Sequence, residues 1–175
     1  MEPQQTIVKQ KEEITPQNTR EQSYRPDQID LKLLGLLQQD GLLTYKELGR
    51  ATHKTHSPIV ERVSRLHRLG FIRKTVALLD IKKIRNTFSA MVMVELNNHI
   101  DAALTDFQQQ MLQYPEVTDC YHVTGHYDFI LRIFTTDIYS YHQFLRSKIG
   151  SLHCVGSLQS FPVLVESKRE TAYTL

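Results

Sequence analysis

Residues Thr44–Phe71 have the sequence TYKELGRATHKTHSPIVERVSRLHRLGF, and this stretch decides the fold of the N-terminal part of the chain. Thr44 followed three residues later by Glu47 is a capping box, which predicts the start of a helix. The polar run Thr52-His53-Lys54 predicts a tight turn, and Pro58 lies where the first turn of a second helix tolerates a missing N–H. Two short helices joined in this way are typical of a helix-turn-helix, whose second helix enters a DNA major groove.

A third helix is predicted just before this stretch. Asp27 is a suitable N-cap residue, and Asp40-Gly41 is a natural stop. Between them, apolar residues recur at helical spacing and predict a buried stripe: Ile29, Leu33, Leu36 and Leu37. The second helix of the pair has its own apolar face of Ile59, Val63 and Leu66, and Gly70 ends it. The expected result is a small three-helix bundle.

Charge is distributed unevenly along the chain. Residues 25–85 contain thirteen Lys and Arg against six Asp and Glu, a net charge of +7. Residues 1–24 have a net charge of −1, and residues 86–175 have a net charge of −4. A basic module joined to an acidic one fits a head that binds a polyanion and a body that does not, although chance asymmetry is the alternative.

The remaining composition is that of an ordinary globular protein, with 41% hydrophobic residues and two cysteines among 175 residues. No apolar run approaches the roughly 18–20 residues that span a bilayer, so no membrane partner is expected. Two thiols and the absence of a secretory signal indicate a reduced, cytoplasmic setting, where a DNA-binding protein would associate with the nucleoid.

After Phe71 the apolar period changes from helical to a mixture of strands and helices. A weak strand is predicted over residues 74–79, followed by a β-α-β-β-α-β order that is ferredoxin-like. Its strands are predicted at 87–96, 117–123, 129–134 and 155–165, and its helices at 100–112 and 138–149. Pro162 within the last strand indicates a sheet edge or a bulge.

The predicted fold class is therefore α+β, with an N-terminal helix-turn-helix domain, a hinge strand and a C-terminal ferredoxin-like domain. The expected domains are a flexible arm (1–24), a DNA-binding domain (25–72), a linker with the hinge strand (73–85), a ligand-sensing and oligomerisation domain (86–169) and a C-terminal tail (170–175).

Four segments, in this order, resemble the leucine-responsive regulator (Lrp/AsnC) family: IDLKLLGLLQQDG, SPIVERVSRLHRLGFI, VALLD and VTGHYDFILRI. The resemblance covers about residues 26–169. It implies a transcription regulator with a helix-turn-helix head, dimers formed through the C-terminal sheets that often assemble into octamers, and an amino acid or related small molecule sensed between C-terminal domains.

The chain departs from the family pattern at two positions. The turn that is usually Gly-Leu-Ser is His53-Lys54-Thr55, so that Lys54 replaces an apolar plug and either packing differs or its stem snorkels. The loop that is usually Gly-Asp is Gly125-His126, which lacks the carboxylate expected to hold an effector's ammonium group.

Candidate DNA contacts come from the helix-turn-helix. Base readout is expected from the start of the second helix, at Thr55, His56, Ser57 and Val60. Arg62 and Arg65 are expected to reach bases or phosphates. Phosphate contacts are expected from Lys46, Arg50, Lys54 and Arg68. The alternative is a solvated basic helix face.

Candidate effector contacts lie in one loop, at Thr124, Gly125, His126 and Asp128, with Glu95, Thr135 and Asp137 as weaker candidates. The alternative is a tight hairpin turn in which Gly125 serves geometry alone. Cys120, His122 and His126 also suggest a metal site, because Cys120 and His122 point to one face of a predicted strand. No third ligand has convincing spacing, so these residues are interpreted as core or interface residues. Neither a metal nor a cofactor is expected.

These features predict a sequence-specific regulator that binds double-stranded DNA as a homodimer or larger oligomer such as an octamer, with assembly or DNA affinity modulated by an amino acid or related molecule. One alternative is a chromatin-organising DNA binder with little sequence preference. Another is an enzyme, because sirohaem decarboxylases share this fold, but their Trp-containing loop pattern is missing here and the chain has no Trp. We therefore predict that the protein is not an enzyme.

Overall fold

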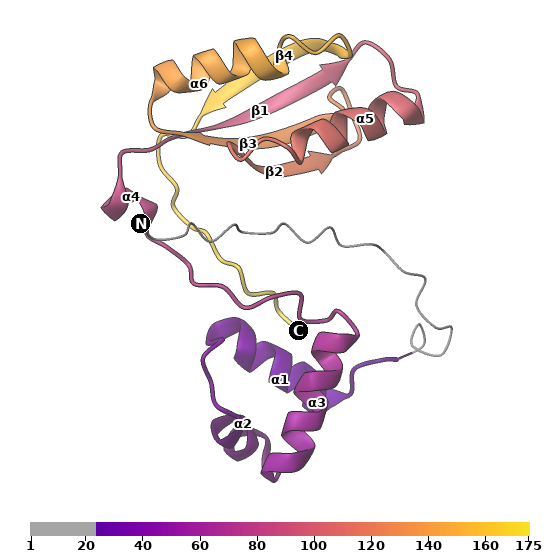
Figure 1. Ribbon diagram of the computed structural model, residues 1–175, viewed down its shortest axis with the longest axis vertical. Coiled ribbons are helices and arrows are strands. Elements are labelled where there is room, and N and C mark those ends of the chain that lie inside the picture. Colours follow the sequence, from indigo (N-terminus) through magenta and orange to yellow (C-terminus); the bar gives the residue numbers. More distant parts are fainter. Residues whose placement is uncertain (1–23) are drawn as a thin grey trace, which may run out of the picture. The chain divides into compact units, whose positions relative to one another are not determined.

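The computed structural model describes residues 24–175, so the predicted arm lies outside the described residues except for Tyr24 (Figure 1). The chain divides into two compact units. One, the head, contains the described residues up to Ala77 together with Glu170–Leu175. The other, the body, is Leu78–Arg169. The last six residues, predicted as a separate tail, thus group with the head.

The head is a bundle of three helices, α1 (Gln28–Gln39), α2 (Tyr45–Thr52) and α3 (His56–Arg68). Both predicted N-terminal caps are confirmed. The Asp27 carboxylate accepts from the backbone N–H groups of Ile29 and Asp30, each at 2.9 Å. Thr44 and Glu47 form the reciprocal capping box of α2. The predicted apolar stripes meet in a core of buried side chains from all three helices: Leu33, Leu48, Ile59, Val63 and Leu66.

A buried carboxylate ties α1 to α3. The Asp30 side chain is 0% exposed, and its Oδ1 lies 2.8 Å from Nη1 of Arg62. The same guanidinium nitrogen lies 2.6 Å from Oδ2 of Asp27. Tyr24 donates its hydroxyl proton to the other Asp30 oxygen, and the Asp27 N–H donates to that oxygen at 3.1 Å. A buried charge must be paired to be tolerated, so this network fixes the relative position of the two helices.

The network lowers the pKa of both carboxyl groups. Burial by itself raises the pKa of Asp30, but the hydrogen bonds from Tyr24 and Arg62 outweigh it, so that the pKa lies below its ordinary value. The Asp30 N–H, and then the Arg62 guanidinium, lower the pKa of Asp27. Both groups are therefore ionised wherever the head is folded near neutral pH.

The body is a four-stranded antiparallel sheet in the order β2-β3-β1-β4 (Figure 1). Its elements follow the predicted ferredoxin-like order: β1 (Phe88–Leu96), α5 (Asp101–Met111), β2 (Val117–His122), β3 (Phe129–Thr135), α6 (Ile138–Phe144) and β4 (Val155–Pro162). A single π-helical turn, Leu145–Ile149, extends α6. Pro162 ends the edge strand β4, where its missing N–H removes no interior ladder bond, as predicted.

Both helices cover one face of the sheet. Alternate residues of β1 and β3 are buried against Phe107 and Met111 of α5 and Tyr141 and Phe144 of α6. The opposite face, called here the open face, carries the other alternate residues, which are only partly buried. Cross-strand register places its central side chains together: Met91, Met93, Ile130, Arg132, Phe134 and Phe161.

The predicted hinge strand is wrong. Residues 73–80 have no regular secondary structure, and the short helix α4 (Ile81–Ile84) follows them. Alternating residues favoured a strand, but a strand needs a neighbour for its backbone N–H and C=O groups, and residues 73–80 have none within the described chain. Val76, Leu78 and Leu79 are accordingly 59%, 73% and 70% exposed.

The lowered pKa values of Asp27 and Asp30 predict acid sensitivity of the head. Groups whose pKa is lowered by folding stabilise the native state fully above their unfolded pKa of about 4, and this stabilisation declines as pH falls from there through the lower native values. We expect Asp30→Asn to reduce the free energy of unfolding near pH 7 by about 1–3 kcal/mol, because it leaves Arg62 without its buried partner.

Native-state hydrogen exchange of the Leu33 and Leu66 amides measures this free energy within the full chain. Between pH 5 and pH 3 the wild type should lose more stability than Asp30→Asn, whereas the body amides of Val92 and Leu131 should respond equally in both proteins. Parallel pH profiles for the two heads would show that the network is not responsible.

Candidate functional site

The turn between α2 and α3 is tight because two backbone segments touch. The Lys54 N–H donates to the Gly49 carbonyl at 2.9 Å, and a Cβ atom at Gly49 would lie 2.8 Å from the Lys54 carbonyl oxygen. His53 sits in the left-handed region, with φ 54° and ψ 41°, where glycine is the easier residue. The unusual His53-Lys54-Thr55 turn therefore keeps a standard backbone shape and leaves Lys54 exposed rather than plugged into the bundle.

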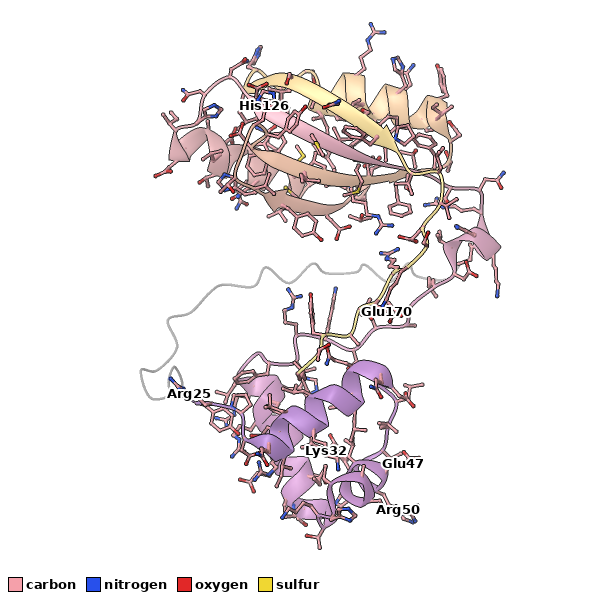
Figure 2. The ribbon with its side chains drawn as sticks, turned by 180° about the vertical axis from the view of Figure 1, so that it is seen from behind. Arg25, Lys32, Glu47, Arg50, His126 and Glu170 are labelled. Carbon is pink, nitrogen blue, oxygen red and sulfur yellow. The ribbon has the colours of Figure 1, made fainter. Side chains whose placement is uncertain are left out.

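Beside this turn lies a shallow, basic depression of about 620 Å³. It brings together predicted contacts from α2, the turn and α3 with three residues that were not predicted, Tyr45, Gly49 and His53. Its lining is Tyr45, Lys46, Gly49, Arg50, His53, Lys54 and His56. Figure 2 shows the Arg50 side chain extending outward from α2. Three permanent cations and no carboxylate line it, so it suits an anion such as a backbone phosphate.

The start of α3 presents a polar exposed row next to the depression. Thr55 is the N-cap, although its side chain makes no capping hydrogen bond, and it is exposed together with His56 and Ser57. The His56 ring stands edge-on to Tyr45, with 5.9 Å between centroids. Val60 is partly exposed on the same side, and Ser64, which sequence reasoning missed, continues the row one turn later. Arg68 is exposed at the end of the helix.

Arg62 and Arg65 lie apart from this row. Arg62 is about 140° around the helix from Ser57 and points toward α1, where Asp27 and Asp30 bind its guanidinium. Arg65 stacks over the Tyr24 ring at 4.7 Å, and its Nη2 is 3.9 Å from Asp30. The two arginines that were expected to reach bases or phosphates thus contact acidic and aromatic groups within the head. The sequence offered only a weak signal of this, the acidic residues at the start of α1.

The predicted effector loop joins β2 and β3, and its ends are closed by hydrogen bonds. The Val123 N–H donates to the Asp128 carbonyl at 2.9 Å, and Gly125 has φ +124°, a conformation that L side chains rarely adopt. A Cβ atom at Gly125 would meet nothing within 4 Å, so open space lies beside the backbone. Glycine is therefore required by the turn, and the space beside it is accessible.

Asp128 is occupied by the protein itself. Its Oδ2 accepts from the Leu96 N–H at 2.7 Å, and its Oδ1 lies 3.2 Å from Nδ1 of His99. This carboxylate therefore anchors the loop to the end of β1. Thr124 and His126 are exposed beside Gly125, and the His126 ring packs edge-on against Tyr127 at 4.7 Å (Figure 2). The Tyr127 hydroxyl in turn donates to Gln159 of β4.

Of the weaker effector candidates, Glu95 lies at the loop end of the sheet, whereas Thr135 and Asp137 lie at the opposite end of β3. These residues and the suggested metal ligands have structural partners. Glu95 accepts from Ser157 at 2.8 Å, and Asp137 caps α6 through the Ser140 N–H at 2.7 Å. The Thr135 hydroxyl donates to the Asp137 carbonyl. Cys120 packs against the body core, and its thiol pKa is raised by burial. His122 stacks on Phe129 at 4.9 Å. Residues 24–175 hold no cluster of three metal-ligating side chains.

None of the helices described for residues 24–175 has the length and apolar character to cross a membrane.

Comparison with known families assigns both units. Residues 27–67 match the AsnC-type helix-turn-helix domain, and residues 89–173 match the Lrp/AsnC ligand-binding domain. A helix-turn-helix transcriptional regulator from Haemophilus influenzae is 33% identical over 85% of this chain and 89% of its own length. The transcriptional activator DecR of Escherichia coli is 31% identical over 83% of this chain and 96% of its own.

Solved structures agree with this assignment. A transcriptional regulator from Neisseria meningitidis, solved as a complex with L-methionine, has a TM-score of 0.78 and 32% identity, covering 85% of this chain and 96% of its own. AsnC from Escherichia coli has a TM-score of 0.77 at 21% identity, covering 85% and 98%, which shows the shared fold. With its helix-turn-helix head and ferredoxin-like body both matched, the chain belongs to the Lrp/AsnC family of transcriptional regulators.

Proposed function

We propose that this protein regulates transcription by placing α3 in the DNA major groove and the adjacent depression over the phosphate backbone. The observation that carries this proposal is the convergence of Lys46, Arg50 and Lys54 on one depression next to the exposed start of α3. Phosphate contacts give affinity and fix the register of a helix, whereas base contacts give specificity. The geometry supplies both kinds of group side by side.

In this proposal, base readout belongs to Thr55, His56, Ser57 and Val60. Hydroxyl and imidazole groups hydrogen-bond with base edges, and the Val60 methyl groups fit against a thymine methyl. Lys46, Arg50, Lys54 and Arg68 bind phosphates. Arg62 is assigned to holding α1 against α3 rather than to DNA, since both of its acidic partners lie within hydrogen-bonding distance. Arg65 is given the same supporting role.

The effector site is assigned to the loop around Gly125. Thr124, the exposed backbone near Gly125 and His126 are the groups that a ligand would meet, whereas Asp128 holds the loop in shape. The relative from Neisseria meningitidis binds L-methionine, which favours an amino acid or a related molecule here. Because His126 replaces the usual carboxylate, we expect weak affinity for a free ammonium group and a preference for a ligand that carries an acceptor or anion.

A second copy of the chain is the proposed cover for the open face. Met91, Met93, Ile130 and Phe134 form a contiguous apolar surface on the two central strands. Surfaces of this kind in folded proteins mark association sites. Two heads on one dimer, or more on a higher oligomer such as an octamer, would bind two half-sites with an avidity that one head lacks.

The assignment as a regulator also leads us to propose that the protein is not an enzyme and that it acts in the cytoplasm, associated with the nucleoid. Its relatives are regulators of transcription. An architectural DNA binder with little sequence preference is the competing role. It differs from a sequence-specific regulator in a lower ratio of specific to non-specific DNA affinity at a stated salt concentration.

For DNA binding, we expect Arg50→Ala and Lys54→Ala each to weaken operator affinity and to reduce the slope of log K against log salt by about 1, because each removes one phosphate contact. Fluorescence anisotropy of a labelled operator measures the affinity and the salt slope. The salt concentration is varied from about 50 to 200 mM, over which phosphate contacts change the affinity steeply. Lys32→Ala, which removes the same charge from α1, is the matched control and should leave the slope unchanged.

Arg62→Ala separates the supporting role from a DNA role. It should lower the stability of the head by about 1–3 kcal/mol while the salt slope of the folded protein stays that of wild type. A salt slope that drops by one for Arg62→Ala, or stays unchanged for both Arg50→Ala and Lys54→Ala, would contradict the proposed interface.

For assembly, we expect Met93→Lys to shift the protein from dimer or larger oligomer toward monomer, since a charge in the middle of the open face cannot be desolvated without a partner. Sedimentation equilibrium measures the mass. Gln109→Lys, an exposed change on α5, makes the same charge change on the helix-covered side. If both variants keep the wild-type mass, the open face is not the interface.

For the effector, we expect His126→Asp to strengthen binding of free amino acids, including L-methionine, by about tenfold, which is the size of one charge-assisted hydrogen bond. Isothermal titration calorimetry measures the affinity. His153→Asp, at another exposed histidine of the body, is the matched control. Equal affinities for His126→Asp and wild type would exclude the loop as the ammonium site.

A further inference from the structure

The final residues of the chain are held by the first helix. The side-chain amide of Gln38 on α1 makes two reciprocal hydrogen bonds with one backbone unit of the tail. Its Nε2 donates to the Tyr173 carbonyl at 3.2 Å, and its Oε1 accepts from the Tyr173 N–H at 2.7 Å. A primary amide presents a donor and an acceptor side by side, as a neighbouring strand does, so this pairing selects an extended backbone rather than a particular side chain.

The tail also shapes a groove with α1. Residues 172–175 form one wall, and the α1 residues Leu31, Lys32, Gly35 and Leu36 lie on the other side. A Cβ atom at Gly35 would meet nothing within 4 Å, so the helix surface there is open. The Tyr173 side chain itself is 80% exposed, so the backbone, rather than the aromatic ring, holds the tail in place.

The segment just before the tail is held by the body. Val163 N–H donates to the Ser89 carbonyl at 2.9 Å, directly after β4. Glu166 then pairs with Arg132, which lies on the open face of β3, and Arg169 stacks over Phe134 at 5.9 Å. The Arg132 guanidinium holds the pKa of the Glu166 carboxyl below its ordinary value. This pair is therefore ionised near neutral pH.

The two anchors are close together along the chain. Only residues 170–172 lie between Arg169, the last body anchor, and Tyr173, the head anchor, and a fully extended chain covers at most about 14 Å over these four residue steps. The other covalent connection, residues 73–80, has no regular structure and imposes no comparable limit.

We propose that Glu166–Leu175 is a strap that couples the open sheet face of the body to α1 of the head. With the strap docked, the head has two connections to the body and its movement is restricted to the span of residues 170–172. With the strap released, only the irregular linker remains. A change at the open face that displaces Arg132 or Phe134 would thereby alter the freedom of the head without altering its DNA-binding surface.

The test compares the wild-type chain with a chain ending at Arg169 and with Gln38→Ala. Backbone ¹⁵N relaxation gives the motion of head amides such as Leu33 and Leu66 relative to body amides such as Val92 and Leu131. We expect the wild-type head to move with the body, and in both variants the head order parameters, referred to the body, should fall from about 0.85 toward 0.6. Gln109→Ala, the same change at an exposed glutamine on α5 of the body, should behave as wild type.

This inference rests on the proposed function only for its consequence in DNA binding, and the relaxation readout is independent of DNA. Affinity for a single half-site should stay within about twofold of wild type in Gln38→Ala, because the depression and α3 are untouched. If truncation unfolds the head, the amide signals of the head will lose their dispersion. In that case the relaxation data of Gln38→Ala alone test the strap. Independent motion of the wild-type head, or unchanged motion in Gln38→Ala, would overturn the strap.

A second copy could supply the tail, and this too is testable. A nitroxide placed at Thr174→Cys, with Cys120→Ala and Cys154→Ala, should broaden the α1 amides of its own chain. The broadening should persist when the labelled chain is diluted with excess unlabelled, ¹⁵N-free protein. If it disappears on dilution, the tail docks on a neighbouring chain and the strap as proposed is excluded.

Discussion

The buried carboxylate of Asp30 is the constraint on which the DNA-binding head depends. A fully buried charge is tolerated only when hydrogen-bond donors surround it, and Tyr24, Arg62 and the Asp27 N–H supply them. Because the donors come from the segment before α1 and from α3, satisfying Asp30 fixes how those parts pack. It also engages the Arg62 guanidinium within the head, while Lys46, Arg50 and Lys54 remain around the depression beside the turn. In the proposed interface, the position of one acidic residue thus decides which basic residues are available to bind DNA.

The body depends on a different constraint, the unequal covering of its sheet. Two helices suffice to bury one face of four strands, and the alternation of β1 and β3 leaves a second face with Met91, Met93, Ile130 and Phe134. That face has a double role in the proposals made here. It is the surface expected to meet a second copy, and it also carries Arg132 and Phe134, which hold the segment leading to the head. In these proposals, assembly and head position would therefore respond to the same surface.

Local signals in the sequence were sufficient to predict most helix boundaries and the elements of the body. The capping residues Asp27, Thr44 and Glu47, the stops at Asp40-Gly41 and Gly70, and the order of strands and helices along the body could all be predicted, because caps, stops and apolar periods are local signals. The strand expected over residues 74–79 failed because strand formation depends on a partner, which periodicity cannot supply. The contacts of Arg62 and Arg65 within the head were not predicted for a related reason: helical spacing shows which side a residue is on, but not which acidic group lies opposite.

The fold class, the helix-turn-helix and the family can be inferred from the amino-acid sequence, since they follow from short-range capping, from the period of apolar residues and from motifs in a fixed order. The roles of individual side chains depend on contacts that form only in the folded chain. Asp128 was a ligand candidate, but its carboxylate accepts a hydrogen bond from the Leu96 N–H and anchors its loop. His53 and Tyr45 line the basic depression. Tyr173 near the end of the chain binds Gln38 of α1, which is 135 residues away in sequence. Hydrogen bonds and ion pairs between distant segments leave no periodic trace in a sequence, so these assignments required coordinates.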